Sequence, residues 1–370
     1  MSTFPTKVRE VPAIEVREAT TFDMEGVAEL HNENYGHEKT SQHWIWEYQT
    51  HHPALAVFTV MTDNGQIVGT QGMIPIYLRL RGETFLSGKS ESSLLDRKYR
   101  GGTAFQELYA FAMSLCKARG MKCIWGLTTA ASVWRNKLLF SVYEDAVYTS
   151  SSVLNLLPAL SEIRGMKQST VRRVRAHLLA SLGYFYGSAR RSLRGKSVGK
   201  RQFTIEHDLR SSHDVDHLYQ RLTAFQHPDL IYIWQDEEYR RWRMSSNPNA
   251  RYMTLFLYED NTLQSYCYVN MAKRSVAYLT DLTFADDEAG SYLLQAVLHR
   301  LHGEGIATVS FLGNLKNPLV ASVFDVLGRF GFIKKRSPLA IVMKNISCGC
   351  AETMYDARNW YLNGLWTEER

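Results

Sequence analysis

The chain has 370 residues, of which 45% are hydrophobic and 22% charged, so its composition is that of a globular protein and its length favours two domains. No apolar run approaches the length of a membrane span, and the N-terminal residues lack the apolar block of a signal peptide. We therefore expect a cytoplasmic protein, and its net charge of +6 does not by itself imply a nucleic-acid partner.

The N-terminal part alternates strand and helix signals. A short strand is expected over residues 14–17, followed by helical spacing from Val27 to His31 and by an aromatic helical segment over 43–48. The turn residues Asp63-Asn64-Gly65 separate two β-rich runs, which predicts a hairpin. A further strand is expected from Thr84 to Leu95.

The stretch from Tyr99 to Phe105 is the one around which the first half is organised. Gly101 and Gly102 lie between the expected strand and an amphipathic helix that is predicted to run to Cys116. Glycines ahead of a helix leave backbone N–H groups open, and the helix dipole adds partial positive charge there. This turn is therefore a place to hold a pyrophosphate. Gly120 is expected to end the helix before another short strand over 122–127.

Residues 164–201 have a different composition from the rest of the chain. Basic residues recur there with no acidic residue between Glu162 and Glu206, and leucines and aromatics lie between them. Such a segment can lie on an anionic membrane surface, contact the phosphates of RNA, or be a solvated helical connector that packs on a domain. The sequence leaves these alternatives open.

The second half repeats the pattern of the first. Trp242 precedes Pro248 as Trp46 precedes Pro53, and β-type runs lead to turn residues at nearly the same offset in both halves. Strand, helix, strand and helix are then expected over 278–284, 293–301, 307–312 and 318–327. We predict an α/β fold with two tandem copies of one mixed-sheet unit. The predicted limits are 1–156 for the first domain, 157–202 for the connector, 203–346 for the second domain and 347–370 for a tail.

The two copies differ at the turn before the central helix. Where the first has Arg100-Gly101-Gly102, the second has Ala285-Asp286-Asp287-Glu288, whose carboxylates would repel a pyrophosphate. Only the first half is therefore a credible anion site. In the tail, Cys348 and Cys350 have the spacing of half a metal site, but no second pair accompanies them, so we expect no metal.

At these residues the chain resembles the GNAT N-acyltransferase superfamily in its tandem form. The family signature, Arg-x-x-Gly-x-Gly/Ala, is similar to the stretch from Arg100 to Phe105, and Lys137-Leu138-Leu139-Phe140 is similar to the family's Lys-Leu-Gly-Phe. The block from Asp236 to Arg243 and the segment Asn359-Trp360-Tyr361 also resemble such proteins. The departures are Thr103 and Leu139 in place of glycines, Thr128-Thr129 in place of Pro-Asn, and Trp134 in place of a tyrosine.

The resemblance implies transfer of an acyl group, in most members acetyl, from acyl-CoA to a primary amine by direct attack of the amine on the thioester. It implies that backbone groups of Leu94 and Leu95 pair with the pantetheine arm. The pyrophosphate would be cradled by the residues of the turn, which are Arg100, Gly101, Gly102, Thr103 and Ala104. In the second copy no cofactor is expected.

A base that accepts the proton of the amine assists this chemistry. We select Glu91, because it lies on the same expected strand just ahead of the cofactor residues, although it could equally be a solvent-facing glutamate. The family's acid is often a tyrosine near the position of Trp134, whose indole donates hydrogen bonds but no useful proton. Tyr143 is the nearest substitute.

The resemblance places an acceptor pocket between the first helices. Polar and aromatic side chains that could recognise a hydroxyl-rich amine gather there, although histidines in a surface loop can also have no such role: His31, Asn34, Tyr35, His37 and His43. The expected function is N-acetyl transfer to an amino sugar of a bacterial polysaccharide pathway. The alternatives are a transferase that uses aminoacyl-tRNA and a degenerate pair that binds glycans or acts as a scaffold. Oligomeric state and acyl length stay open.

Overall fold

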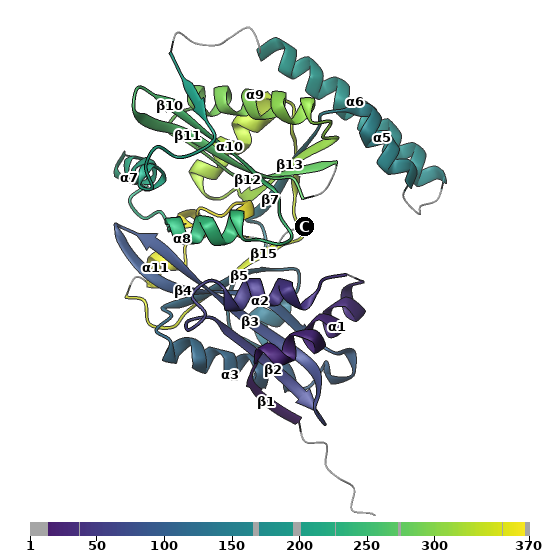
Figure 1. Cartoon of the computed structure of the whole chain (residues 1–370), viewed down its shortest axis with the longest axis vertical. Helices are drawn as coiled ribbons and strands as arrows, with labels where there is room; N and C mark the ends of the chain where they lie inside the picture. Colours follow the sequence, from purple (N-terminus) through teal and green to yellow (C-terminus); the bar gives the residue numbers. More distant parts are fainter. Residues whose placement is uncertain are drawn as a thin grey trace, which may run out of the picture. The chain divides into compact units, whose positions relative to one another are not determined.

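The computed structural model describes residues 14–36, 38–165, 170–194, 201–225, 227–272, 275–349 and 351–366. Figure 1 shows the helices and strands, coloured along the sequence. The chain divides into two compact units. Unit 1 comprises Met1–Pro75 and Gly88–Met121, and unit 2 comprises Ile76–Ser87 and Lys122–Arg370.

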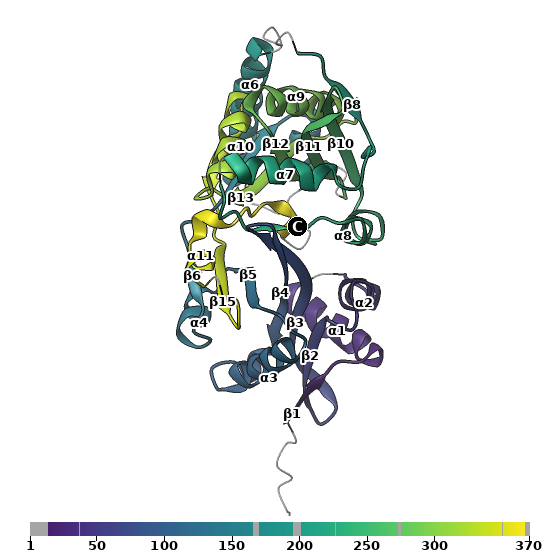
Figure 2. The ribbon, with the colours of Figure 1, turned by 90° about the vertical axis from the view of Figure 1, so that its left-hand side faces the viewer.

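Unit 1 is an antiparallel sheet with helices on both faces (Figure 2). In chain order it contains β1 (Ile14–Glu18), α1 (Met24–Tyr35), α2 (Ser41–Gln49), β2 (Val57–Asp63), most of β3 (Gln66–Leu80) and β4 (Glu83–Leu95), and α3 (Ala104–Ala118). The predicted hairpin is confirmed, because Asn64 and Gly65 turn between β2 and β3 with φ of 51° and 80°.

In the core of unit 1, α3 packs against the end of β4. Leu95 and Leu108 pack with Met61 and Val68, and Phe105 lies against this cluster. Gly69 permits the approach, since a Cβ there would lie 2.8 Å from Leu95 and 3.3 Å from Leu108. The apolar residues whose spacing predicted the helix therefore also hold its N-terminal part against the end of β4.

Unit 2 contains the remaining strands of the first sheet and the whole of the second. β5 (Cys123–Thr128) and β6 (Ser141–Tyr143) follow in the first sheet, with α4 (Ala131–Asn136) between them. The second sheet has the order β14-β7-β13-β12-β11-β10-β8. Its strands are β7 (Val147–Val153), β8 (Thr204–Glu206), β10 (Tyr252–Glu259), β11 (Thr262–Asn270), β12 (Val276–Phe284), β13 (Thr308–Asn314) and β14 (Ile333–Arg336).

Unit 2 contains the remaining helices. They are α5 (Leu156–Gly165), α6 (Thr170–Arg194), α7 (Asp214–Phe225), α8 (Glu237–Arg240) with a following π-helix Arg241–Ser245, α9 (Asp287–Gly303), α10 (Pro318–Arg329) and α11 (Ala351–Met354). The predicted repeat is confirmed in backbone detail. The amide of Asp96 donates to Val68 O at 2.8 Å in the first copy, and the amide of Ala285 donates to Gln264 O at 2.8 Å in the second.

Two strands are exchanged between the sheets. β7 precedes the expected limit at residue 156, yet it pairs antiparallel with β13 and β14 of the second sheet. β15 (Ala340–Asn345) precedes the expected limit at residue 346, yet it lies between β5 and β6 of the first sheet. Each sheet therefore contains a strand from the other half of the chain, and strand pairing does not follow the predicted domain limits.

Candidate active site

The turn ahead of α3 is built from a short 3-10 helix, Arg97–Tyr99, and the two glycines. The Asp96 carboxylate accepts a hydrogen bond from the Lys98 amide at 2.9 Å and so begins the turn. Gly101 has a φ of 99°, which a residue with a Cβ adopts only under strain. No atom lies within 4 Å of the position that a Cβ would take at Gly101 or Gly102, so the turn is open.

The N-terminus of α3 is not closed by a carboxylate cap. Thr103 is the N-cap residue, and within the described structure its side chain makes no cap hydrogen bond; its hydroxyl donates to the Glu107 carboxylate at 2.6 Å. Its backbone has φ −90° and ψ −12°, an ordinary right-handed conformation. Threonine in place of the family's glycine therefore imposes no backbone strain on this turn.

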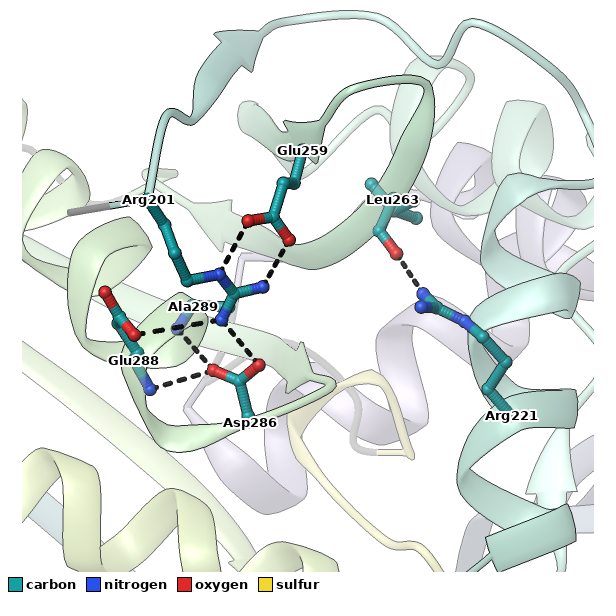
Figure 3. A network of polar contacts seen from close by, with 7 residues as sticks. All are labelled: Arg201, Arg221, Glu259, Leu263, Asp286, Glu288 and Ala289. Carbon is teal, nitrogen blue, oxygen red and sulfur yellow. Dashed lines mark hydrogen bonds and ion pairs between the residues drawn. The ribbon is translucent and has the colours of Figure 1, made fainter. Parts of the chain in front are cut away.

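The second copy closes the same position with its own side chains, as Figure 3 shows. Asp286 caps α9 by accepting from the amides of Glu288 at 3.0 Å and Ala289 at 2.9 Å. Arg201 donates to Asp286 at 2.7 Å and to Glu259 at 2.8 Å. Burial raises the pKa of Asp286, but the Ala289 amide and Arg201 outweigh it, so the net pKa is lowered and the carboxylate stays charged.

The C-terminal segment fills a second part of that copy. The parallel pairing of β12 and β13 ends at Leu279 and Phe311. Beyond that point the Asn314 amide donates to Leu362 O at 2.9 Å, and a Cβ on Gly364 would lie 2.8 Å from the Cα of Thr280. The chain itself therefore occupies the gap between these strands, where an extended ligand arm would have to lie.

Cationic side chains surround the open turn of the first copy. Arg100 is exposed; its Nε donates to Leu95 O at 2.7 Å and its Nη2 to Asn34 Oδ1 at 3.1 Å, which ties the end of β4 to α1. Arg97 and Lys98 are exposed beside it. Positive charge and open N–H groups thus meet at one helix N-terminus, which is the arrangement that favours an anion.

The strand leading to this turn carries a distortion that the sequence analysis missed. Ser92, within β4, has a φ of 51°, and its carbonyl accepts a hydrogen bond from the Thr70 hydroxyl at 2.7 Å. His31 Nε2 lies 2.9 Å from the same Thr70 oxygen. Because the one Thr70 proton goes to Ser92, His31 must donate, so its Nε2 carries hydrogen. The signal available in the sequence was the serine-rich run within a strand.

A second set of hydrogen-bonded side chains joins β3 to β4. Gln71 is fully buried; its amide donates to Ser90 Oγ at 3.0 Å, and Ser93 Oγ donates to Gln71 Oε1 at 2.6 Å. Buried polar groups that are paired in this way hold a strand in one position. Gln71 therefore holds the distorted strand β4 in place, and the side chains of Leu94 and Leu95 are buried in the core.

Glu91 is partly buried and paired. Lys89 Nζ donates to Glu91 Oε2 at 2.7 Å, and both residues project from the same face of β4. The reading of Glu91 as an unengaged solvent-facing residue does not fit this pair. Its role as the base stays a prediction.

Tyr143 lies on β6, in unit 2. Its hydroxyl donates to the backbone oxygen of Tyr355, and burial raises its pKa. Trp134 is buried with its ring edge against Phe140, at 4.9 Å between centroids. Leu139 has a φ of 56°, a left-handed conformation that glycine would adopt without strain. The role of Tyr143 as an acid also stays a prediction.

Two histidines of the expected acceptor pocket lie on α1 and α2 and are buried, whereas Tyr35 is 54% exposed. His31 and His43 are 7% and 5% exposed and pack on the Trp44 ring at 5.0 and 5.1 Å. Asn34 and Tyr35 lie on α1, and His37 lies outside the described residues. The Trp44 indole N–H is buried without a hydrogen-bond partner in the described part of the chain.

The comparisons with known proteins agree with this architecture. Residues 15–137 match the model of the acetyltransferase (GNAT) domain. A structure from Enterococcus faecalis V583, described as a probable N-acyltransferase, has 8% identity and a TM-score of 0.57, covering 90% of this chain and 73% of that one. No protein of curated function matches the sequence.

Residues 15–137 form a GNAT domain, and the chain has the tandem GNAT fold. The GCN5-related N-acetyltransferase of Kribbella flavida has 10% identity and a TM-score of 0.53, covering 90% of this chain and 71% of that one. Saccharomyces cerevisiae N-myristoyltransferase with bound myristoyl-CoA has 12% identity and a TM-score of 0.56, covering 93% and 86%. At these identities the likeness establishes the fold.

Proposed function

We propose that this tandem GNAT protein is an N-acyltransferase that moves an acyl group from acyl-CoA to a primary amine at its first copy. The observation that carries the proposal is the contrast between two equivalent helix ends. The first has an open glycine turn beside Arg100, whereas the second is capped by Asp286 and paired with Arg201. An anionic cofactor group is stabilised by the first environment and repelled by the second.

The residues of the first copy fit the shape of acyl-CoA. Backbone N–H groups of the turn from Gly101 to Ala104 would hold the pyrophosphate, with Arg100 adding charge. Leu94 and Leu95 would pair with the pantetheine arm through their backbone. The thioester supplies the activated acyl group, which the amine attacks directly. Glu91, on the same strand, would accept the proton released from that amine.

The acceptor in this proposal is an amino sugar of a bacterial polysaccharide pathway, and the donor is acetyl-CoA. Support comes from the polar and aromatic side chains near α1 and α2, where Asn34 and the exposed Tyr35 could bind hydroxyl groups. Because a structural neighbour was solved with myristoyl-CoA, longer acyl chains belong in the same test.

The test is calorimetric titration with acetyl-CoA, myristoyl-CoA and CoA, followed by a free-thiol assay with amino sugars. Arg100→Ala should weaken acyl-CoA binding by about tenfold, because one charge-assisted contact is worth about 1.5 kcal/mol or more. Arg300→Ala, on α9 of the second copy, is the matched control and should bind normally.

The outcomes separate the alternatives. Absence of binding by any acyl-CoA to folded protein would overturn the proposal and leave a non-catalytic glycan-binding or scaffold protein. Transfer that requires aminoacyl-tRNA in place of acyl-CoA would identify that donor class. If binding persists but Glu91→Gln leaves the rate unchanged, the cofactor site stands and the assignment of the base fails.

A further inference from the structure

Helix α6 belongs to unit 2 and packs on the second sheet through its glycines. Gly183 lies against Val153 of β7, and Gly187 lies against Ser152, where an added Cβ would be 3.0 Å from the hydroxyl. A Cβ on Gly331 would lie 2.4 Å from the Cα of Gly187, so the helix also approaches the turn before β14 closely. Arg191 Nη1 donates to Ser152 Oγ at 3.1 Å on the same side. One face of α6 is thus fixed to the second sheet.

Away from these contacts, α6 exposes large apolar side chains. They recur at helical spacing, so that Val174, Leu178 and Leu182 follow one another at every fourth position. The exposed fractions of these three residues and of Leu179, Phe185 and Tyr186 range from 43% to 66%. Such side chains usually lose most of their accessible surface on folding. We call this set the α6 stripe: Val174, Leu178, Leu179, Leu182, Phe185 and Tyr186.

Arginines accompany the α6 stripe and carboxylates do not. Arg172, Arg175 and Arg190 are exposed on the helix, and the Arg190 guanidinium lies 5.4 Å from the centre of the Tyr186 ring. The sequence has no acidic residue between Glu162 and Glu206. Apolar surface and positive charge are therefore presented together, over a helix about 38 Å long.

We propose that the α6 stripe docks this protein on the surface of an anionic lipid bilayer, with the helix lying in the interfacial plane. A bilayer matches both properties, because the apolar side chains enter the acyl boundary while the arginines meet lipid phosphates. RNA would pair with the arginines but leave the leucines in water. A second copy would cover the leucines but bring two rows of arginines together.

The helix docks on the bilayer and does not cross it. Among the described helices none combines the length and apolar character that spanning requires. On α6 the exposed Arg175 and Arg190 lie within one turn of Leu178 and Tyr186, which is the pattern of interfacial rather than spanning helices. The proposal does not depend on acyl transfer.

Vesicle flotation of the full chain tests the docking. Vesicles of phosphatidylcholine with about 30% phosphatidylserine should carry the protein, and pure phosphatidylcholine should carry much less, because the surface potential comes from the anionic lipid. Binding should weaken as salt rises from about 50 to 500 mM. Leu178→Glu with Leu182→Glu should lower the partition coefficient by at least about tenfold.

Charge and control variants complete the test. Arg172→Gln, Arg175→Gln and Arg190→Gln together should lower binding by about a hundredfold, since each arginine near the surface contributes about fivefold. Lys316→Gln, Lys334→Gln and Lys335→Gln remove the same charge elsewhere in unit 2, and Phe22→Glu alters an apolar side chain that is 96% exposed, more than any of the α6 stripe. Both controls should float like the wild type.

Three results would overturn the docking. Absence of flotation with anionic vesicles at low salt contradicts it directly. RNA binding that the arginine variants abolish and the leucine variants leave intact would assign the surface to nucleic acid. A dimer in light scattering that dissociates in the Leu178→Glu, Leu182→Glu variant, without vesicle binding, would assign it to a second copy.

Discussion

Leu139 is a residue whose conformation conflicts with its side chain. It combines a φ of 56° with 75% exposure, so its backbone is strained and its apolar side chain gains little from burial. For a residue with a Cβ, the left-handed conformation costs about 1–2 kcal/mol. This strain is independent of any ligand.

Leu139→Gly should therefore raise the free energy of unfolding by about 1 kcal/mol, measured by urea denaturation. The neighbouring change Lys137→Gly is the control, because Lys137 has a right-handed backbone with a φ of −98°. At position 137 glycine relieves no strain and only increases the entropy of the unfolded chain. Lys137→Gly should therefore lower the free energy of unfolding by about 0.5–1 kcal/mol. Equal effects of the two changes would contradict the strain argument.

Asp281 is a fully buried carboxylate in the second copy. Tyr266 donates to it at 2.7 Å, Gln235 at 3.1 Å and Thr283 at 2.9 Å. Burial nevertheless raises the pKa of Asp281 to about 6, because these donors are neutral and offset only part of the lost solvation. The folded protein therefore binds this proton more tightly than the unfolded chain does.

Because the folded pKa lies above the unfolded value of 3.8, stability from Asp281 is fully present below that value and is lost as pH rises toward about 6. The loss should amount to about 3 kcal/mol over this window. Asp281→Asn, which resembles the protonated carboxyl, should flatten the urea midpoint between pH 4 and about 6. A decline as steep as in the wild type would exclude Asp281 as its source.

At the scale of elements, the two copies show how one strand-turn-helix unit can be open or closed. α3 begins at an open glycine turn, whereas α9 begins with a carboxylate that accepts two backbone amides. The closed form gains helix stability and loses the ability to bind an external anion.

Asp286→Ala should lower the free energy of unfolding by about 1 kcal/mol or more, because it removes the cap of α9 and a partner of Arg201. Asp145→Ala serves as the control, since Asp145 is 65% exposed in its pair with Arg336 and such pairs contribute little. Differential scanning fluorimetry and urea midpoints report both. A loss no larger than that of the control would show that the cap is not stabilising.

At the scale of the whole molecule, strand exchange joins the two copies. β15 pairs with β5 over six residues and with β6 over three, and β7 pairs with β13 over seven. Non-local pairing of this kind gives β5 and β13 a partner on a side that would otherwise be a sheet edge. It also makes each sheet depend on residues that are remote in sequence.

A fragment of residues 1–156 should therefore not fold stably, because it lacks β15 and leaves β5, β6 and β7 unpaired on the sides that β15 and β13 cover. Limited proteolysis and near-ultraviolet circular dichroism check this, with the full chain as the reference. A soluble fragment with cooperative unfolding would show that the exchange is dispensable.

The sequence by itself determined the repeat, the hairpins, the turn at Gly101 and the helix that follows, because local periodicity and glycine geometry encode each of them. Tertiary structure alone decided the exchange of β7 and β15, the burial of His31 and His43, the bonding of Thr70 to Ser92, and the filling of the second copy by residues near Leu362. These features join residues that are distant along the chain, and no local pattern reports such contacts.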